Sequence, residues 1–305
     1  MMKNKISVAI ATYNGEKFIT KQFDSILSQT LLPDEIIIVD DASNDNTLKI
    51  LNVYALQYPI IKIFTNEQNL GATKTFERAV NLCDGEFIIL SDQDDVWFKN
   101  KIEVLMTNIG NAKLIHHDAK LIDDNDQIIG NSLLEFIDYY HIPDFFTRLM
   151  REGVHGCCLM MRREVVLAAR KIPSGFIYHD FFYNLTAAAL GEIRTLTQPL
   201  MSYRLHNNNA CGLFADKSYE RAMKDYRKNL NNMQLIIGLS QFAVHQKEIQ
   251  FYIDYYSKFV YEEYSSVRFI FKVAKLLGKE KAFALLVNNV FGSKGIKFIY
   301  DKLRK

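Results

Sequence analysis

The chain has 305 residues, of which 49% are hydrophobic and 24% charged, with a formal net charge of +2. This composition supplies a sizeable apolar core and excludes global disorder. The length suits one large α/β domain, or one domain with an appendage.

The cysteines form no disulfide framework, because there are only four in the chain and no C-x-x-C pair occurs. We expect reduced, mostly buried thiols in a cytoplasmic protein. The apolar stretch after Lys5 is too short for a signal peptide, and no run approaches the roughly 18 apolar residues of a membrane span. A soluble or peripheral protein is therefore predicted.

The first hundred residues alternate between short apolar runs and helical patterns. The runs typical of buried strands are residues 6–11, 36–39, 60–64 and 86–90. Apolar residues at three- and four-residue spacing predict helices after residue 18, around 47–57 and near 71–83. The alternation predicts an α/β fold with a mostly parallel sheet covered by helices on both faces.

After residue 110 the pattern loosens, although strands and helices are still indicated. We expect strands at 113–117, 154–161, 193–196 and 200–205, and helices at 164–171 and 179–190. From about residue 216 the chain looks helical and rich in Tyr, Phe and Lys. A site-bearing domain over 1–212 and a helical, basic amphipathic region over 213–305 are therefore predicted.

Polar groups follow the predicted strands at their carboxyl ends, where parallel sheets bind ligands. These groups are Thr12, Tyr13 and Asn14, then Asp40 and Asp41, then Asn66, and finally Asp92 to Asp95. We expect them to converge on one edge of the sheet.

The acidic turn Asp92-Gln93-Asp94-Asp95 is the strongest of these signals. Carboxylate oxygens suit Mn²⁺ or Mg²⁺, which would bridge two phosphates of a donor, and one of the carboxylates can instead meet a ribose. An isolated acidic turn is usually only solvated, but a second acidic pair at a neighbouring strand end favours a metal site. We predict Asp92, Asp94 and His206 as metal ligands, and the choice between Asp94 and Asp95 stays open.

A nucleoside site is predicted beside the metal. Tyr13 can flank a base, Thr12 can contact base or ribose, and the carboxylates of Asp40 and Asp41 can accept the ring N–H of uracil or thymine. The candidates for donor binding are Thr12, Tyr13, Asn14, Asp40, Asp41, Asn69, Gly71 and Asp92. Helix capping by Asp40 or Asp41 and an ordinary loop at Gly71 are the alternatives.

Asp180 is the predicted general base, because a carboxylate can take the proton of an attacking hydroxyl. Its alternative role is to cap the helix that it begins. Arg204 and His206 combine a cation and an imidazole in one short segment and are predicted to face a diphosphate. A structural cluster is the alternative there.

These motifs, in this order, resemble family 2 of the inverting glycosyltransferases, which has the GT-A fold. The matching segments are IATYN, VDDASNDNT, NLGA, SDQDDVW, His179-Asp180 and YRLHNNN, and they cover roughly residues 5–210. The form SDQDDVW is similar to a bacterial branch that includes rhamnosyltransferases of cell-surface polysaccharides.

The resemblance implies a metal-assisted single displacement. A UDP- or dTDP-sugar would be the donor, with dTDP-rhamnose as one option, and a free or lipid-linked saccharide the acceptor. Thr12, Tyr13 and Asp41 would bind the nucleoside, Asp92 and Asp94 would form the D-x-D motif, and Asp180 would be the base. His179 stands where relatives often have Glu, which leaves open what assists the base.

The C-terminal tail is strongly basic, with ten Lys or Arg residues against two acids between Arg268 and Lys305. An amphipathic helix of this kind can lie on an anionic membrane, so residues 265–305 are a candidate contact with the inner face of the membrane. The alternative is that its apolar face packs on the catalytic domain or on a second subunit of an oligomer.

Other functions fit less well. A dinucleotide-dependent oxidoreductase would need G-x-G-x-x-G after the first strand, and a nucleotidyltransferase would need a Gly-rich basic loop there. Neither pattern is present. No nucleic-acid partner is expected, because the predicted cleft is acidic. A non-catalytic protein that binds nucleotide sugar or glycan remains the alternative function.

Overall fold

The computed structural model describes residues 4–137, 145–150, 155–206, 219–261, 263, 265–277, 281, 283–286 and 288–289. The chain forms two compact units. The first consists of Met1–Ile172 and Tyr178–Ala210, and the second of Pro173–Ile177 and Cys211–Lys305.

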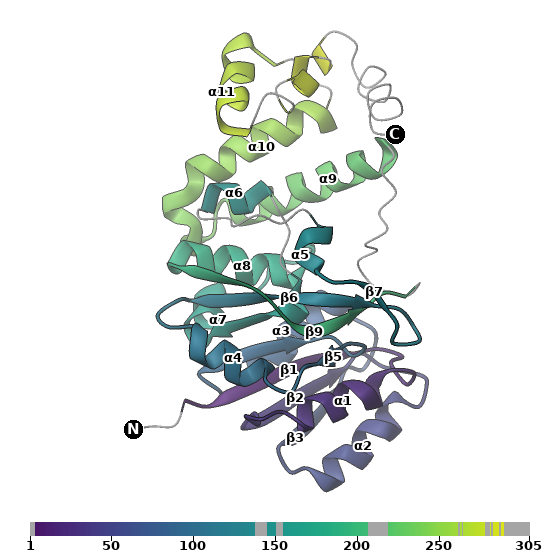
Figure 1. Cartoon of the computed structure of the whole chain (residues 1–305). Helices are drawn as coiled ribbons and strands as arrows, with labels where there is room; N and C mark the ends of the chain where they lie inside the picture. The colour runs from purple at the N-terminus through teal and green to yellow at the C-terminus, as the bar shows by residue number, and fades with distance from the viewer. Residues whose placement is uncertain are drawn as a thin grey trace. The chain divides into compact units, whose positions relative to one another are not determined.

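The first unit is built on one mixed sheet, which helices surround (Figure 1). Its strands are β1 (Ile6–Thr12), β2 (Glu35–Asp40), β3 (Ile61–Thr65), β4 (Phe87–Ser91), β5 (Val96–Trp97), β6 (Leu114–Ile122), β7 (Ile128–Gly130), β8 (Leu159–Arg162) and β9 (Ile193–Arg204). The order is β3-β2-β1-β4-β8-β6-β9-β5, with β7 paired to β6.

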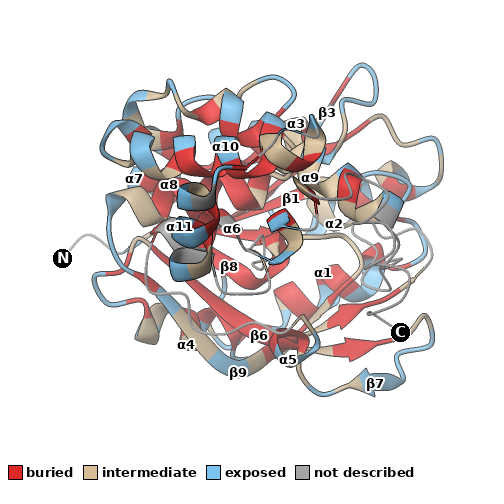
Figure 2. Ribbon diagram, turned by 90° about the horizontal axis from the view of Figure 1, so that it is seen from above, coloured by how far each residue is buried: buried red, intermediate tan, exposed pale blue. Residues whose placement is uncertain are grey.

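The predicted α/β class with a mostly parallel sheet is confirmed. Strands β1 to β4 are parallel neighbours, and β6 pairs in parallel with β9. Strand β8 is inserted antiparallel between β4 and β6. The buried residues follow β1, β8 and β6 (Figure 2), which explains why these runs are almost continuously apolar.

The helices of the first unit pack around this sheet. They are α1 (Ile19–Leu27), α2 (Thr47–Gln57), α3 (Ala72–Leu82), α4 (Lys101–Asn108), α5 (Leu133–Phe136), α6 (Phe145–Met150), α7 (Arg163–Ala169) and α8 (His179–Leu190). Helix α3 packs on β1 and β2, and α8 packs on α3 and α7. In α1 the buried residues Ile19, Phe23 and Ile26 have the spacing of one helix face.

The strand order reverses between β1 and β4. From β1 the chain proceeds outward to β2 and β3, and then returns to place β4 on the other side of β1. Such a switch point opens a crevice at the carboxyl ends of the strands, where ligands bind in open α/β sheets. The segments that follow β1 and β4, from Tyr13 and from Asp92, therefore meet at this crevice.

Two predictions of strands were wrong in detail. The segments 193–196 and 200–205 belong to one strand, β9. Pro199, which cannot donate a ladder hydrogen bond, lies between them and is tolerated because it pairs with Asp118, where the register shifts. The segment 154–161 is not one strand. A short 3-10 turn, η1 (Gly156–Cys158), precedes β8. Backbone groups of this turn form hydrogen bonds with side chains of the site and not with a neighbouring strand.

The second unit is helical in its described part. Its elements are α9 (Tyr219–Ile236), η2 (Ser240–His245), α10 (Gln246–Val260) and α11 (Val267–Leu277). Helices α9 and α10 pack through aromatic rings, with Tyr226 5.1 Å from Phe259 and 5.6 Å from Tyr256 between ring centroids. Within the described residues, no helix has both the length and the apolar character required to cross a bilayer.

Candidate active site

Asp40 organises the turn after β2. Its buried carboxylate accepts hydrogen bonds from the Thr12 hydroxyl at 2.8 Å, from the Ser43 hydroxyl at 2.6 Å and from the Ser43 N–H at 2.9 Å. The ends of β1 and β2 are thereby tied together beneath the crevice. Contact of Thr12 or Asp40 with a base stays a prediction.

Asp41 holds the loop that leads into α3. Its carboxylate accepts from the Asn66 amide at 2.7 Å and from the N–H groups of Leu70 and Gly71, both at 2.8 Å. Gly71 has φ +81°, a backbone conformation that residues with a Cβ rarely adopt. The exposed Asn69 lies in the same loop. Asp41 is therefore hydrogen-bonded to the loop that contains Asn69 and Gly71, and donor binding by these three residues stays a prediction.

Tyr13 and Asn14 form the rim of the crevice after β1. Tyr13 is 45% exposed, which leaves its ring available to stack on a base. Asn14 has a left-handed backbone, with φ +48°. Its N–H donates to the Ser43 hydroxyl at 2.9 Å, and its side-chain oxygen accepts from the Asn44 N–H at 2.9 Å. These contacts hold the rim against the turn after β2.

Gln93 was not predicted to have a role, yet it joins the two loops at the switch point. Its side-chain oxygen accepts from the Tyr13 N–H at 2.9 Å, and its amide nitrogen donates to the Tyr13 carbonyl at 3.0 Å. A Cβ at Gly15 would lie 2.3 Å from that oxygen, so a larger residue there would displace the Gln93 side chain. The D-x-D pattern contains no signal for this contact, because its middle position is unspecified.

The acidic turn after β4 is a cluster of like charges. Loss of hydration, together with the neighbouring charges of Asp94 and Asp180, raises the pKa of Asp92 to about 7. Burial beside Asp94 and Asp92 raises the pKa of Asp95 well above its usual range. Asp94 pairs with His206, whose Nε2 lies 2.8 Å from a carboxylate oxygen. A group of this kind binds cations, because a cation relieves the mutual repulsion.

The donor atoms fit a divalent cation. Among the described residues, the possible ligand atoms of Asp92, Asp95 and Cys157 lie within 4.8 Å of one another. Asp95 is fully buried, and its Oδ2 has no hydrogen-bond partner. An orphaned buried carboxylate oxygen is costly unless something binds it. The structure thus pairs Asp94 with His206 and separately groups Asp92 with Asp95, and the metal ligation by Asp92, Asp94 and His206 stays a prediction.

Asp180 stands at the start of α8, directed by two backbone groups. Its Oδ2 accepts from the Gly156 N–H of η1 at 2.9 Å, and its Oδ1 accepts from the Phe181 N–H at 2.8 Å. Burial raises the pKa of Asp180 to about 6. Asp180 contacts Gly156, and the next residue, Cys157, groups with Asp92 and Asp95, so the turn η1 brings the two carboxylates into one region. A pKa near neutrality suits a general base.

His179 lies beside Asp180 in a different environment. Its ring stacks on Phe76 with centroids 4.0 Å apart, and burial lowers its pKa to about 3. The imidazole is therefore neutral at physiological pH and cannot supply a cation to the site.

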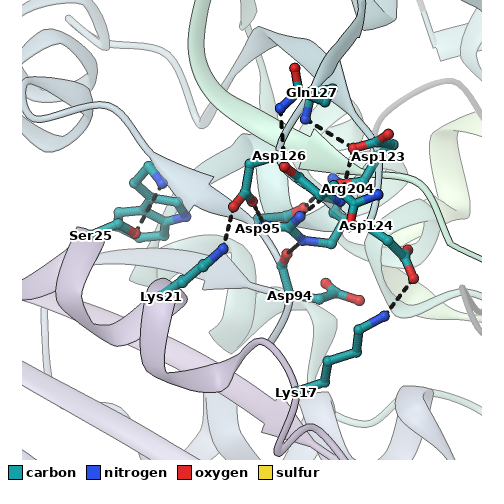
Figure 3. Close-up of polar contacts among 12 residues, drawn as sticks. Lys17, Lys21, Ser25, Asp94, Asp95, Asp123, Asp124, Asp126, Gln127 and Arg204 are labelled. Atoms are coloured by element: carbon teal, nitrogen blue, oxygen red, sulfur yellow. Dashed lines mark hydrogen bonds and ion pairs between the residues drawn. The ribbon is translucent and has the colours of Figure 1, made fainter.

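Arg204 joins the acidic turn to the turn after β6 (Figure 3). The wholly buried guanidinium donates to the Asp94 carbonyl at 2.8 Å, the Asp123 carbonyl at 2.7 Å and the Asp126 carboxylate at 2.5 Å. The backbone N–H of Arg204 donates to a carboxylate oxygen of Asp95 at 3.1 Å. Contact of Arg204 with a diphosphate stays a prediction, and these bonds agree with the alternative, a structural cluster.

The aromatic ring of Phe18 supports both members of the predicted diphosphate pair. The Arg204 guanidinium lies 4.5 Å from the ring centroid, and the His206 ring lies 5.3 Å from it. Lys17 and Lys21, next to this ring in sequence, pair with Asp124 and Asp126 of the same turn (Figure 3). The carboxylates of that turn are thereby neutralised.

Comparison with known proteins gives consistent matches. A family model described as glycosyl transferase family 2 matches residues 7–168. The chain is 30% identical to a dTDP-rhamnosyl transferase, RfbG, of Shigella flexneri over 219 residues, which is 67% of this chain and 73% of the relative. It is 28% identical to a UDP-Glc:alpha-D-GlcNAc-diphosphoundecaprenol beta-1,3-glucosyltransferase, WfgD, of Escherichia coli, over 58% of this chain and 67% of the relative.

Solved structures share the fold. The S. aureus protein TarS, residues 1–349 in complex with UDP-GlcNAc, superposes with a TM-score of 0.63 at 17% identity, covering 98% of this chain and 91% of that one. A mannosyltransferase of Pyrobaculum calidifontis in complex with GDP-Man and Mn²⁺ gives a TM-score of 0.56 at 13% identity, covering 94% of this chain and 87% of that one. At these identities the likeness concerns the fold alone.

Proposed function

This chain belongs to glycosyl transferase family 2, and from that premise we propose that it moves a sugar from a UDP- or dTDP-linked donor to a saccharide acceptor with inversion. The enzyme has the GT-A fold and acts on nucleotide sugars. Family membership also supports an enzyme, and not the alternative function of a non-catalytic binding protein. The single observation that supports the proposed mechanism is the position of the turn η1, whose Gly156 N–H donates to Asp180 and whose Cys157 ligand atom lies within 4.8 Å of those of Asp92 and Asp95.

In the proposed mechanism the crevice between β1 and β4 receives the donor. Tyr13 stacks on the base, and the loop held by Asp41 closes around the nucleoside. Asp92, Asp94 and His206 would hold Mn²⁺ or Mg²⁺ in this proposal, with Asp95 as the alternative carboxylate. The bound cation would neutralise negative charge on the leaving diphosphate.

Asp180 takes the proton of the acceptor hydroxyl. The hydroxyl oxygen forms a bond to the anomeric carbon while the bond from that carbon to the diphosphate oxygen breaks, and its electron pair leaves with the nucleoside diphosphate. The proton ends on a carboxylate oxygen of Asp180. The backbone N–H groups of Gly156 and Phe181 hold that carboxylate in one orientation before the acceptor arrives.

Substitution of the base tests the mechanism. We expect Asp180→Asn to lower kcat by about 10²–10⁴-fold, because the amide cannot accept the proton. Donor binding, measured by calorimetry with UDP- and dTDP-sugars in the presence of Mn²⁺, should be retained. Nucleoside diphosphate release is the assay, and Asp84→Asn, at an exposed carboxylate, is the matched control. Normal turnover by a folded Asp180→Asn protein would remove Asp180 from the mechanism.

The relatives also suggest the kind of donor and acceptor. One is named a dTDP-rhamnosyl transferase, and another acts on a sugar linked to diphosphoundecaprenol. We propose dTDP-rhamnose or a UDP-hexose as the donor, and a saccharide, free or lipid-linked, as the acceptor in cell-surface polysaccharide synthesis. A panel of nucleotide sugars with Mn²⁺ should identify the donor as the one that raises Tm most, since a ligand that binds the folded state stabilises it.

A contact of the second unit with the membrane belongs to the same proposal. On α11, Ile270 and Val273 are buried, whereas Phe271 is 71% exposed. The exposed side chains in its described part include three cations, Arg268, Lys272 and Lys275. Cations beside an exposed aromatic ring suit an anionic interface. Residues 290–305 of the predicted segment lie outside the described part. We propose a cytoplasmic enzyme that is peripheral on the inner face of the membrane.

A further inference from the structure

Lys101, the first residue of α4, has a wholly buried side chain. Its ammonium donates to the Cys157 carbonyl at 2.7 Å, lies 3.8 Å from the centroid of the Trp97 ring and is 3.4 Å from the Met201 sulfur. None of the ion pairs found among the described residues includes Lys101. A buried ammonium without a carboxylate in contact is costly.

The acidic turn adjoins the residue that Lys101 contacts, since the ligand atoms of Cys157, Asp92 and Asp95 lie within 4.8 Å of one another. Burial lowers the pKa of Lys101 to about 8, and the acidic side chains of Cys158 and Cys157, followed by those of Asp95 and Asp92, act in the opposite direction. In return, the positive charge of Lys101 lowers the pKa of Asp92. Interactions of this kind are strong across a dry interior even when the groups do not touch. Lys101 therefore offsets part of the negative charge of the cluster.

The backbone of η1 connects the same lysine to both carboxylates of the mechanism. The Cys157 carbonyl accepts from Lys101, and the N–H of the preceding residue, Gly156, donates to Asp180. The ligand atoms of Cys157, Asp92 and Asp95 lie within 4.8 Å of one another. One three-residue turn thus bears contacts to the internal cation, the predicted base and the acidic motif.

We propose that Lys101 is the resident counter-cation of the acidic site, and that its fixed positive charge sets how tightly the site holds a divalent metal. The inference rests on the metal site of the proposed function. Lys101 stabilises the clustered carboxylates when no metal is present, and it opposes the bound metal by like-charge repulsion. As a positioning residue it also anchors η1 through the Cys157 carbonyl.

Variants of Lys101 separate its charge from its hydrogen bond. Lys101→Gln keeps a donor for the Cys157 carbonyl but removes the charge, Lys101→Met removes both, and Lys101→Arg keeps both. Lys99→Met, at an exposed lysine of the same segment, is the matched control. Circular dichroism and thermal melts establish that each variant is folded, and Lys101→Gln serves if Lys101→Met does not fold.

The measurement is calorimetric titration of the full-length protein with Mn²⁺ alone. We expect Lys101→Gln and Lys101→Met to bind Mn²⁺ on the order of tenfold more tightly than wild type, because a nearby like charge has been removed. Lys101→Arg and Lys99→Met should bind as wild type does. Unchanged or weaker binding by folded Lys101→Gln would overturn the counter-cation proposal.

The same titration distinguishes this proposal from the proposed function. Absence of Mn²⁺ binding by wild type would contradict the metal-assisted mechanism. If Lys101→Gln then bound Mn²⁺, the positive charge of Lys101 would be shown to prevent metal binding in wild type, which supports the counter-cation role. Absence of binding in every variant would overturn both proposals.

Discussion

At the scale of single residues, the site is held by side chains that contact backbone rather than by the carboxylates alone. Gln93 occupies the unspecified position of the D-x-D pattern, yet its amide meets both the N–H and the carbonyl of Tyr13. Two hydrogen bonds across the switch point couple the nucleoside rim to the acidic turn. Such paired contacts fix geometry, because both must break before the rim can move.

Gln93→Ala should therefore impair donor binding more than chemistry. We expect KM for the nucleotide sugar to rise about tenfold with a smaller change in kcat, since loss of an interaction made equally in the ground and transition states raises KM alone. Steady-state kinetics against donor concentration is the measurement. Gln57→Ala, at an exposed glutamine at the end of α2, is the control. An unchanged KM would show that the rim does not depend on Gln93.

Asp180 determines the expected pH dependence. Burial raises its pKa to about 6, and the base acts in its deprotonated form. We expect kcat/KM to be constant above this pKa and to fall about tenfold per pH unit below it. The folded state also holds this proton more tightly than the unfolded state, so Asp180 makes the fold less stable as pH rises through about 6. A profile without an inflection near this value, in protein that stays folded, would contradict the assignment.

At the scale of elements, the 3-10 turn η1 is the least predictable part of the site and the one that connects most of it. An apolar pattern over 154–161 indicates a strand, and the structure forms one only from Leu159. Before that point the backbone bonds to Lys101 and Asp180. Local periodicity cannot reveal this, because the bonding groups come from other elements.

Gly156→Ala tests the turn directly. A Cβ at Gly156 would lie 3.0 Å from the His179 Nε2 and 3.3 Å from the Asp180 Cβ, so the base must shift by a few tenths of an ångström. We expect kcat to fall by about 10²-fold at most, because small misplacements of reacting groups are costly. Gly238→Ala, where a Cβ meets nothing within 4 Å, is the control. Equal kcat in both variants would show that η1 does not position Asp180.

At the scale of the whole molecule, the two compact units divide the predicted tasks. The first contains the sheet, the crevice and every candidate site residue that the structure describes. The second bears the aromatic packing of α9 and α10 and the cationic face of α11. The division between a catalytic domain over 1–212 and a helical, basic amphipathic region over 213–305 stays a prediction.

Vesicle flotation tests the membrane contact with the full chain. We expect the protein to float with anionic vesicles at low salt, and Lys272→Glu with Lys275→Glu to weaken flotation, because each cation near an anionic surface contributes about 1 kcal/mol. Lys49→Glu with Lys99→Glu, at two exposed lysines of the first unit, is the control for net charge. Equal flotation of the control and the double variant would contradict a contact through α11.

The sequence by itself determined the strand and helix alternation, the parallel sheet and the gathering of Asp41, Asp92 and the Tyr13 rim at one edge. These follow from local periodicity and from the rule that parallel strands share a carboxyl edge. Only the tertiary structure decided the pairing of Gln93 with Tyr13 and of Lys101 with Cys157, which are 80 and 56 residues apart. Such contacts join a side chain to a distant backbone group, and no local pattern of residue types records which backbone group that is.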